Sequence, residues 1–250
     1  MRTNLYGQPV GDPVPDWQPR PRPDASALTG SFCRLERLDA SRHAAELFEA
    51  DRADGNGASW TYLPYGPFAD PGAYTVWVEQ MAARPDPYFF AVVDTVESSP
   101  TAGRAVGVLS LMRVHQEAGS IEVGHIHYSP ALQHRPAGTE AHYLLGSYVF
   151  DQLGYRRYEW KCDTLNEPSR RAAERLGFSY EGIFRQSQVV KGRNRDTAWY
   201  AIIDGDWPAV RSAFEAWLSP DNFDANGRQR SALQTRRRKV APRESAPAER

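Results

Sequence analysis

The feature that most constrains the fold is an alternation of strand-like and helix-like segments through the middle of the chain. Runs of β-branched and aromatic residues predict strands, whereas apolar residues recurring every three or four positions predict helices. Strands interleaved with helices and hairpins indicate a mixed sheet covered by helices, which is an α/β domain. The predicted strands cover residues 30–38, 88–93, 105–114, 121–128, 158–162, 178–190 and 197–203, and the predicted helices start at Ser41 and Pro71 and cover 139–153, 168–176 and 207–218.

Composition excludes several classes of protein. The 250 residues are 41% hydrophobic and 24% charged, as in an ordinary globular domain. No run approaches the roughly 20 apolar residues that cross a bilayer, and the first 30 residues lack the apolar core of a signal peptide. Cys33 and Cys162 are too few for a disulfide framework or a four-thiolate zinc site. We therefore expect a soluble cytoplasmic protein with no membrane contact and no metal.

Both ends differ in composition from the middle. Six prolines fall in the first 30 residues, and each fixes φ and removes a backbone donor, which predicts an extended arm over residues 1–27. The last 30 residues hold eight basic and four acidic groups and few large apolar ones, which predicts a disordered basic tail over 221–250. A single domain is predicted over 28–220, and a homodimer is left open.

The segment 128–141 carries the first functional signal, because a strand ends, a short loop with Pro and Gly follows, and a helix begins. Free N–H groups at a helix start and the positive end of its dipole form a natural phosphate site. The alternative is a plain strand-to-helix turn with Thr139 near the cap.

A second group of motifs follows in a specific order: residues 166–169, then Leu-Gly-Phe at 176–178, then Glu181-Gly182. Together with 133–138 and Thr-Glu-Ala at 139–141, their order and spacing make the chain similar to the Gcn5-related N-acetyltransferases (GNAT). Within that superfamily it resembles the RimJ/RimL-like branch of ribosomal-protein N-acetyltransferases. The resemblance covers roughly residues 28–204.

The resemblance implies a single-domain acyl-CoA N-acyltransferase fold with a mixed, mostly antiparallel sheet flanked by helices. Its two splayed central strands would be 121–128 and 158–162, with acetyl-CoA between them. The implied reaction moves an acetyl group from acetyl-CoA to a primary amine, of a protein N-terminus or a small molecule, by direct attack in a ternary complex. The residues implied in cofactor binding are Tyr128, Gln133, Arg135, Ala137, Gly138, Thr139, Asn166 and Ser169.

One departure from the family pattern is Pro136, which stands where the loop pattern has its first glycine and has no N–H to offer a phosphate. The Arg135 side chain can offset this loss, because guanidinium binds phosphate in a fork. Pro136 keeps open a second reading, a catalytically weak CoA-binding regulatory module. A third reading, a nucleic-acid-associated protein acting through residues 228–239, is not favoured because no aromatic residues interleave with the basic ones.

The resemblance also implies catalytic residues. It places Asn166 against the cofactor arm and Ser169 near the sulfur, where a hydroxyl can donate to the departing thiolate; a cap residue and an early-helix polar residue are the alternatives. Glu122 is the first candidate for the base, because it fits the acidic position of this branch just before a glycine, here Gly124. His127 is the second, since histidine titrates near neutral pH.

An aromatic segment at 60–68 lies where the family covers its acceptor. Aromatic walls exclude water and pack apolar or cationic groups, although a loop packed on its own rings explains the composition equally well. The predicted acceptor-binding residues are Trp60, Tyr62, Tyr65 and Phe68.

Cys162 shows no Cys-His signature, so a buried strand cysteine is favoured over a covalent acyl-cysteine.

Overall fold

A computed structural model describes residues 2–224 and 227–235. The four basic residues at 236–239 lie outside the described part of the chain. Within it, no helix is both long and apolar enough to span a membrane.

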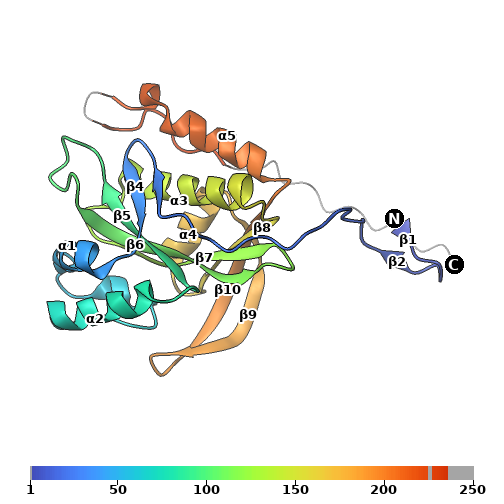
Figure 1. The fold of residues 1–250 in the computed structure, drawn as a ribbon, viewed down its shortest axis with the longest axis horizontal. Coiled ribbons are helices and arrows are strands. Elements are labelled where there is room, and N and C mark those ends of the chain that lie inside the picture. Colours follow the sequence, from blue (N-terminus) through green and yellow to red (C-terminus); the bar gives the residue numbers. More distant parts are fainter. Residues whose placement is uncertain (1, 225–226, 236–250) are drawn as a thin grey trace.

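An eight-stranded sheet forms the centre of the molecule (Figure 1), in the order β3-β4-β5-β6-β7-β8-β10-β9. Neighbouring strands are antiparallel except β7 and β8, which are parallel. This mixed, mostly antiparallel sheet confirms the predicted fold class. The strands are β3 (Ala27–Thr29), β4 (Cys33–Arg37), β5 (Tyr88–Asp94), β6 (Ala105–His115), β7 (Ser120–Tyr128), β8 (Arg157–Asp163), β9 (Ser179–Val190) and β10 (Arg193–Ile203).

Helices cover the two faces of the sheet and enclose two apolar cores. One core lies beneath α1 and α2 and contains Trp60, Trp77 and Phe89. The larger core lies beneath α3, α4 and α5 on the other side (Figure 1). The helices are α1 (Ala40–Arg52), α2 (Pro71–Ala82), α3 (Pro136–Ser147), α4 (Glu167–Arg175) and α5 (Trp207–Leu218), with short turns at η1 (Ala58–Trp60), η2 (Tyr148–Gln152) and η3 (Pro220–Asn222).

Polar residues fix where the helices begin. Asp39 and Asp70 accept a hydrogen bond from the third residue beyond them, at the starts of α1 and α2, and Asn166 does the same at the start of α4. Such caps satisfy backbone donors that have no partner inside the helix. The predicted helix at 139–153 begins earlier, at Pro136, because proline suits the first helical position.

The N-terminal arm lies along the domain and then leaves it. The Trp17 indole donates to the Glu117 carbonyl at 2.8 Å, and the Tyr155 hydroxyl donates to the Pro21 carbonyl at 2.9 Å. Before Trp17, strands β1 (Arg2–Thr3) and β2 (Pro9–Val10) pair only with each other and extend away from the sheet (Figure 1).

The C-terminal boundary differs from the expected one at residue 220. The Trp217 indole donates to Gln229 at 3.0 Å, and the Thr235 hydroxyl donates to the Arg175 carbonyl at 2.7 Å. Leu233 joins the larger core with 8% of its surface exposed. Residues 227–235 therefore pack on the domain, because one buried leucine and a few hydrogen bonds anchor a segment whose average composition is polar.

Candidate active site

The central feature of the site is the point at which β7 and β8 separate. The two strands pair from Ser120 opposite Arg157 to Val123 opposite Trp160, and no described residue beyond these continues the ladder. In β7 a bulge follows directly, with His125 at φ 52° and a shifted register against β6. A bulge bends its strand and redirects side chains, so it accounts for the divergence.

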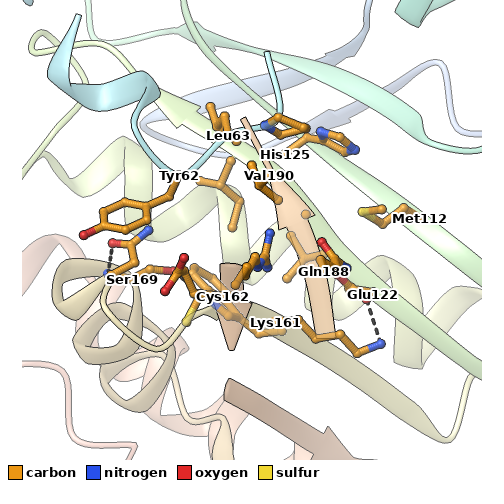
Figure 2. Close-up of a pocket in the computed structure, with 18 of the residues that line it drawn as sticks. Tyr62, Leu63, Met112, Glu122, His125, Lys161, Cys162, Ser169, Gln188 and Val190 are labelled. Carbon is orange, nitrogen blue, oxygen red and sulfur yellow. Dashed lines mark hydrogen bonds and ion pairs between the residues drawn. The ribbon is translucent and has the colours of Figure 1, made fainter. Parts of the chain in front are cut away.

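A cavity of about 180 Å³ opens where the strands diverge (Figure 2). It is lined by β6, β7, β8, the start of α4, the β9–β10 hairpin and the loop after α1. The site residues predicted from the sequence that reach it are Tyr62, Glu122, Asn166 and Ser169.

Ser169 is oriented by its neighbours in this cavity. Its hydroxyl oxygen accepts from the Trp160 indole N–H at 3.0 Å, and its backbone N–H donates to Asn166 Oδ1 at 3.2 Å. Because the oxygen already accepts a hydrogen bond, the hydroxyl proton is directed to the remaining side, where the Cys162 thiol also lies. Cys162 also lines the cavity, and burial raises the pKa of its thiol while a hydrogen bond with Ser169 lowers it.

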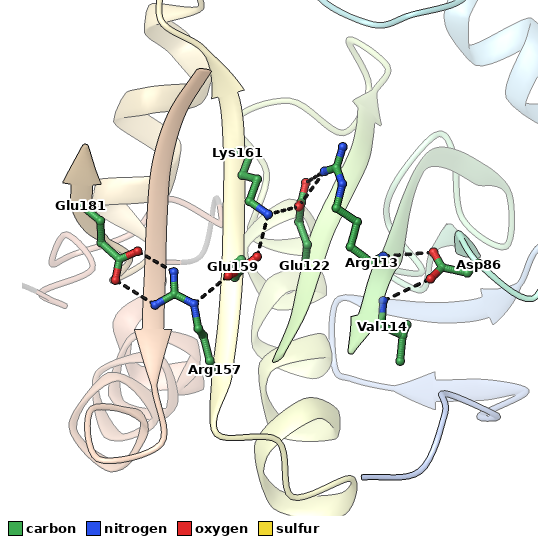
Figure 3. Close-up of polar contacts among 8 residues, drawn as sticks. All are labelled: Asp86, Arg113, Val114, Glu122, Arg157, Glu159, Lys161 and Glu181. Carbon is green, nitrogen blue, oxygen red and sulfur yellow. Dashed lines mark hydrogen bonds and ion pairs between the residues drawn. The ribbon is translucent and has the colours of Figure 1, made fainter. Parts of the chain in front are cut away.

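Glu122 lies at the centre of a network of charges (Figure 3). Arg113 Nη1 contacts both of its carboxylate oxygens at 2.7 Å, and Lys161 Nζ lies 2.8 Å from Oε2. Lys161 also bonds Glu159 at 2.7 Å, and Arg157 connects Glu159 to Glu181. The Glu122 side chain is only 4% exposed and pairs with two cations. It therefore links β7 to Arg113 on β6 and to Lys161 on β8.

The start of α3 lies at the end of β7, as the phosphate-site prediction requires. The three residues after Pro136 are buried, whereas Gln133 and Arg135 are exposed. A Cβ on Gly138 would lie 3.2 Å from the Tyr128 ring, so this glycine permits close packing against Tyr128. The Thr139 hydroxyl accepts from Arg175 at 3.1 Å, which ties the helix start to the end of α4.

Comparison with known proteins decides the family. A family model described as an acetyltransferase (GNAT) domain matches residues 34–179, which is more than half of the chain. The chain belongs to the GNAT acetyltransferase family.

Solved GNAT structures match nearly the whole folded part. A GCN5-related N-acetyltransferase from Brucella melitensis is 47% identical with a TM-score of 0.84, and the match covers 88% of this chain and 98% of that one. A GNAT-family structure from Chromobacterium violaceum ATCC 12472 is 39% identical with a TM-score of 0.72, over 80% and 98% of the two chains.

A curated relative carries the branch resemblance. YdaF of Bacillus subtilis (strain 168), provisionally named a ribosomal N-acetyltransferase, is 31% identical over 107 residues, which are 42% of this chain and 57% of the relative. The chain thus spans a little over half the length of that protein. The predicted family, its similarity to the ribosomal-protein branch and the predicted fold are confirmed.

His127, the second candidate base, does not line the cavity. Its ring stacks on Trp60 at 3.6 Å, its Nε2 lies 2.8 Å from the Ser59 hydroxyl, and its Nδ1 lies 3.4 Å from Asp51. Burial lowers the pKa of His127 to about 4 and raises that of Asp51 to about 7. The pair is therefore not an ion pair at neutral pH, and His127 anchors η1 and α1 to the sheet.

Most of the aromatic segment packs inward, and three of the four predicted acceptor residues do not line the cavity. Trp60 is 3% exposed in the smaller core, and Tyr65 and Phe68 pack around it. Only Tyr62 lines the cavity, with its hydroxyl donating to the Leu165 carbonyl at 3.0 Å. The segment is held from outside by the hairpin tip, where Lys191 Nζ donates to the carbonyls of Trp60 and Gly66 at 2.8 Å.

His125 is the cavity residue that the sequence analysis did not select. Its Nδ1 lies 2.9 Å from the Tyr65 hydroxyl, and its ring lines the cavity (Figure 2). Burial, together with nearby arginines, lowers the pKa of His125 to about 4, so the ring is neutral at physiological pH. Its position beside Gly124 is visible in the sequence, whereas the bulge that brings it to the cavity is not.

Proposed function

We propose that the chain is an acetyl-CoA-dependent N-acetyltransferase whose acceptor amine attacks the thioester directly at the separation of β7 and β8. The observation that carries the proposal is the Ser169 hydroxyl, which accepts from Trp160 and directs its proton away from the indole, in the cavity where the two strands diverge. In the RimJ/RimL-like branch that the chain resembles, this serine position lies near the sulfur of CoA.

Ser169 acts in this proposal as the acid for the leaving thiolate. Its oxygen accepts from Trp160, so the hydroxyl proton is directed to the remaining side. A thiol with a pKa near 8.5 leaves without much assistance, so the serine supplies a modest part of the acceleration. Asn166 holds the backbone of Ser169 at the start of α4 and thereby sets the direction of the hydroxyl.

The acceptor has to arrive as a neutral amine, because no strong base is free. Glu122 is satisfied by Arg113 and Lys161, and we now assign it to positioning rather than to proton transfer. His125 is neutral and accepts a proton at Nε2 when its Nδ1 donates to Tyr65. With a pKa of about 4 it is a weak base, whose contribution is small.

The acceptor belongs to a protein N-terminus or a small amine. A cavity of about 180 Å³ suits one terminal residue or a small molecule. Direct transfer is favoured over an acyl-cysteine at Cys162, because burial raises the pKa of that thiol and keeps it protonated.

The test is a screen of thiol release from acetyl-CoA across primary amines and N-terminal peptides. We expect release only when an accepted amine is present, and we expect Cys162→Ala to retain it. CoA binding without release against every amine would favour the regulatory-module reading, for which the missing N–H of Pro136 is the relevant feature.

A further inference from the structure

Arg195 stands out among the charged residues that line the cavity. It lies on β10 and lines the cavity, and its guanidinium makes no hydrogen bond or ion pair with any residue that the structure describes. Its Nε is fully buried and has no hydrogen-bond partner among the described residues. A buried donor without a partner is costly, so this N–H group is available to a ligand.

The other two cations of the cavity wall are already paired. Arg113, Lys161 and Arg195 face the cavity against two carboxylates, those of Glu122 and Asp163. Arg113 and Lys161 are committed to Glu122, whereas one carboxylate oxygen of Asp163 accepts from the Leu165 backbone at 2.9 Å. Asp163 acts on Arg195 through its charge but makes no hydrogen bond with it among the described contacts, so the N–H groups of Arg195 remain for a ligand.

A second polar side chain stands beside it. Gln188 on β9 is the register partner of Arg195 across the hairpin and also lines the cavity (Figure 2). An Arg guanidinium binds a carboxylate through two parallel N–H donors, and a Gln amide adds a third donor. The hairpin is fixed over the cavity, because Lys191 and Arg193 donate to carbonyls of the loop at 60–66.

We infer that the acceptor amine carries a carboxylate of its own, which Arg195 and Gln188 hold while the amine faces the Ser169 side of the cavity. This inference rests on the proposed function and specifies its substrate class as amino acids or terminal residues with an acidic group. The carboxylate would accept a hydrogen bond from the buried Nε of Arg195 and would orient the amine. Amines without a carboxylate would lack both effects.

The experiment compares carboxylated amines with their own amides, using free amino acids and short peptides as probes. Thiol release from acetyl-CoA gives kcat/KM, and calorimetry gives acceptor binding without turnover. For the best acceptor we expect the acid to be favoured over its amide by at least about 10-fold, since a charge-assisted hydrogen bond has that magnitude. Arg195→Gln should reduce this preference to within about 3-fold, on the same scale, while the KM for acetyl-CoA stays unchanged.

Arg185→Gln is the matched control, because it removes the same charge from the same hairpin at an exposed position outside the cavity. It should retain the full preference. Equal use or binding of acids and amides by the wild type, or a preserved preference in Arg195→Gln, overturns the inference, as does a panel in which no carboxylated amine binds. An absence of thiol release with retained, Arg195-dependent binding of acids would refute the proposed transfer and leave the carboxylate site standing.

Discussion

At the scale of single residues, the site depends on how neighbouring groups use up each other's hydrogen-bonding capacity. The Trp160 indole donates to the oxygen of Ser169, so the hydroxyl proton of the serine points to the other side. Arg113 and Lys161 occupy the oxygens of Glu122 and tie it to β6 and β8. Two residues that the sequence presents as candidates for proton transfer, the serine as acid and the glutamate as base, thus receive different surroundings.

The first prediction concerns Ser169→Ala. Acid catalysis contributes roughly 100- to 10,000-fold in general, but a thiolate leaves well unaided, so we expect kcat to fall on the order of 10- to 100-fold. The KM for acetyl-CoA should change little, because the loss falls on the transition state. Steady-state kinetics check this, with the exposed Ser187→Ala as the control that keeps wild-type rates. A wild-type kcat in Ser169→Ala would leave the serine as a helix-start residue only.

The second prediction concerns Glu122→Gln. The change leaves Arg113 without its carboxylate and removes one of the two carboxylates of Lys161. We expect the free energy of unfolding to fall by about 1–3 kcal/mol, as for a buried charged hydrogen bond. The pH dependence of kcat/KM should keep the shape set by the acceptor amine.

Urea unfolding measures the loss of stability, and Glu181→Gln, at the more exposed end of the same network, serves as the control. That control should lose less than about 1 kcal/mol because solvent screens its pair. A shifted alkaline limb in Glu122→Gln, with unchanged stability, would return the role of base to this carboxylate.

At the scale of elements, the bulge in β7 decides which histidine reaches the site. Strict alternation along 121–128 puts His125 and His127 on one face and Glu122 on the other. The positive φ at His125 breaks this alternation, so Glu122 and His125 both line the cavity and His127 does not. The existence of the strand is predictable from its β-branched and aromatic residues, whereas a bulge on a non-glycine residue is not.

The packing of the C-terminal segment is also not predictable from local sequence pattern. Its average composition indicates a disordered tail, yet Leu233 enters the core and Thr235 bonds the end of α4. Contacts such as that between Arg175 and Thr139, or between Lys191 and Trp60, join residues far apart in the chain. Local patterns carry no information about them.

The third prediction compares two truncated chains. A chain ending at residue 235 should be more stable than one ending at 228 by about 2–4 kcal/mol, because the shorter one loses a buried leucine and the hydrogen bonds of Gln229 and Thr235. Thermal unfolding of both chains checks this. Leu233→Ala in the longer chain should reproduce most of the difference, and equal melting temperatures would show that the segment does not stabilise the domain.

At the scale of the whole molecule, the sheet lies between two groups of helices (Figure 1). It separates two apolar cores, and the cavity opens where β7 and β8 diverge. The sequence motifs were sufficient to predict the family, the sheet and its splayed pair, because these follow from local pattern and from resemblance. Of the four predicted acceptor-binding residues, only Tyr62 lines the cavity. The other three pack inward, because a hydrophobic core lies beneath the aromatic segment.

The fourth prediction concerns pH and the buried histidines. Burial lowers the pKa of His125 and His127 to about 4 and that of His142 to about 3. The unfolded chain therefore binds more protons below pH 6.5, and stability is lost as the pH falls from there. Each histidine should cost about 2 kcal/mol between pH 6.5 and 5.

The raised pKa of Asp51, about 7, works in the opposite direction and offsets part of this loss. Urea unfolding at pH 7 and pH 5 measures the sum, and His125→Gln should reduce the loss by about one histidine's share. His115→Gln is the control, since this exposed side chain should leave the difference unchanged. An identical pH dependence in His125→Gln and the wild type would show that His125 is not buried in its neutral form.

The most direct measurement of the central claim is the mass of both protein and amine after a single turnover with acetyl-CoA. Without an amine, we expect the protein to gain no acetyl group and acetyl-CoA to remain intact. With an accepted amine, the amine should gain one acetyl group for each CoA thiol released. An acetyl group on the protein, at Cys162 or elsewhere, would contradict direct attack, and bound acetyl-CoA that transfers to no amine would contradict the enzyme itself.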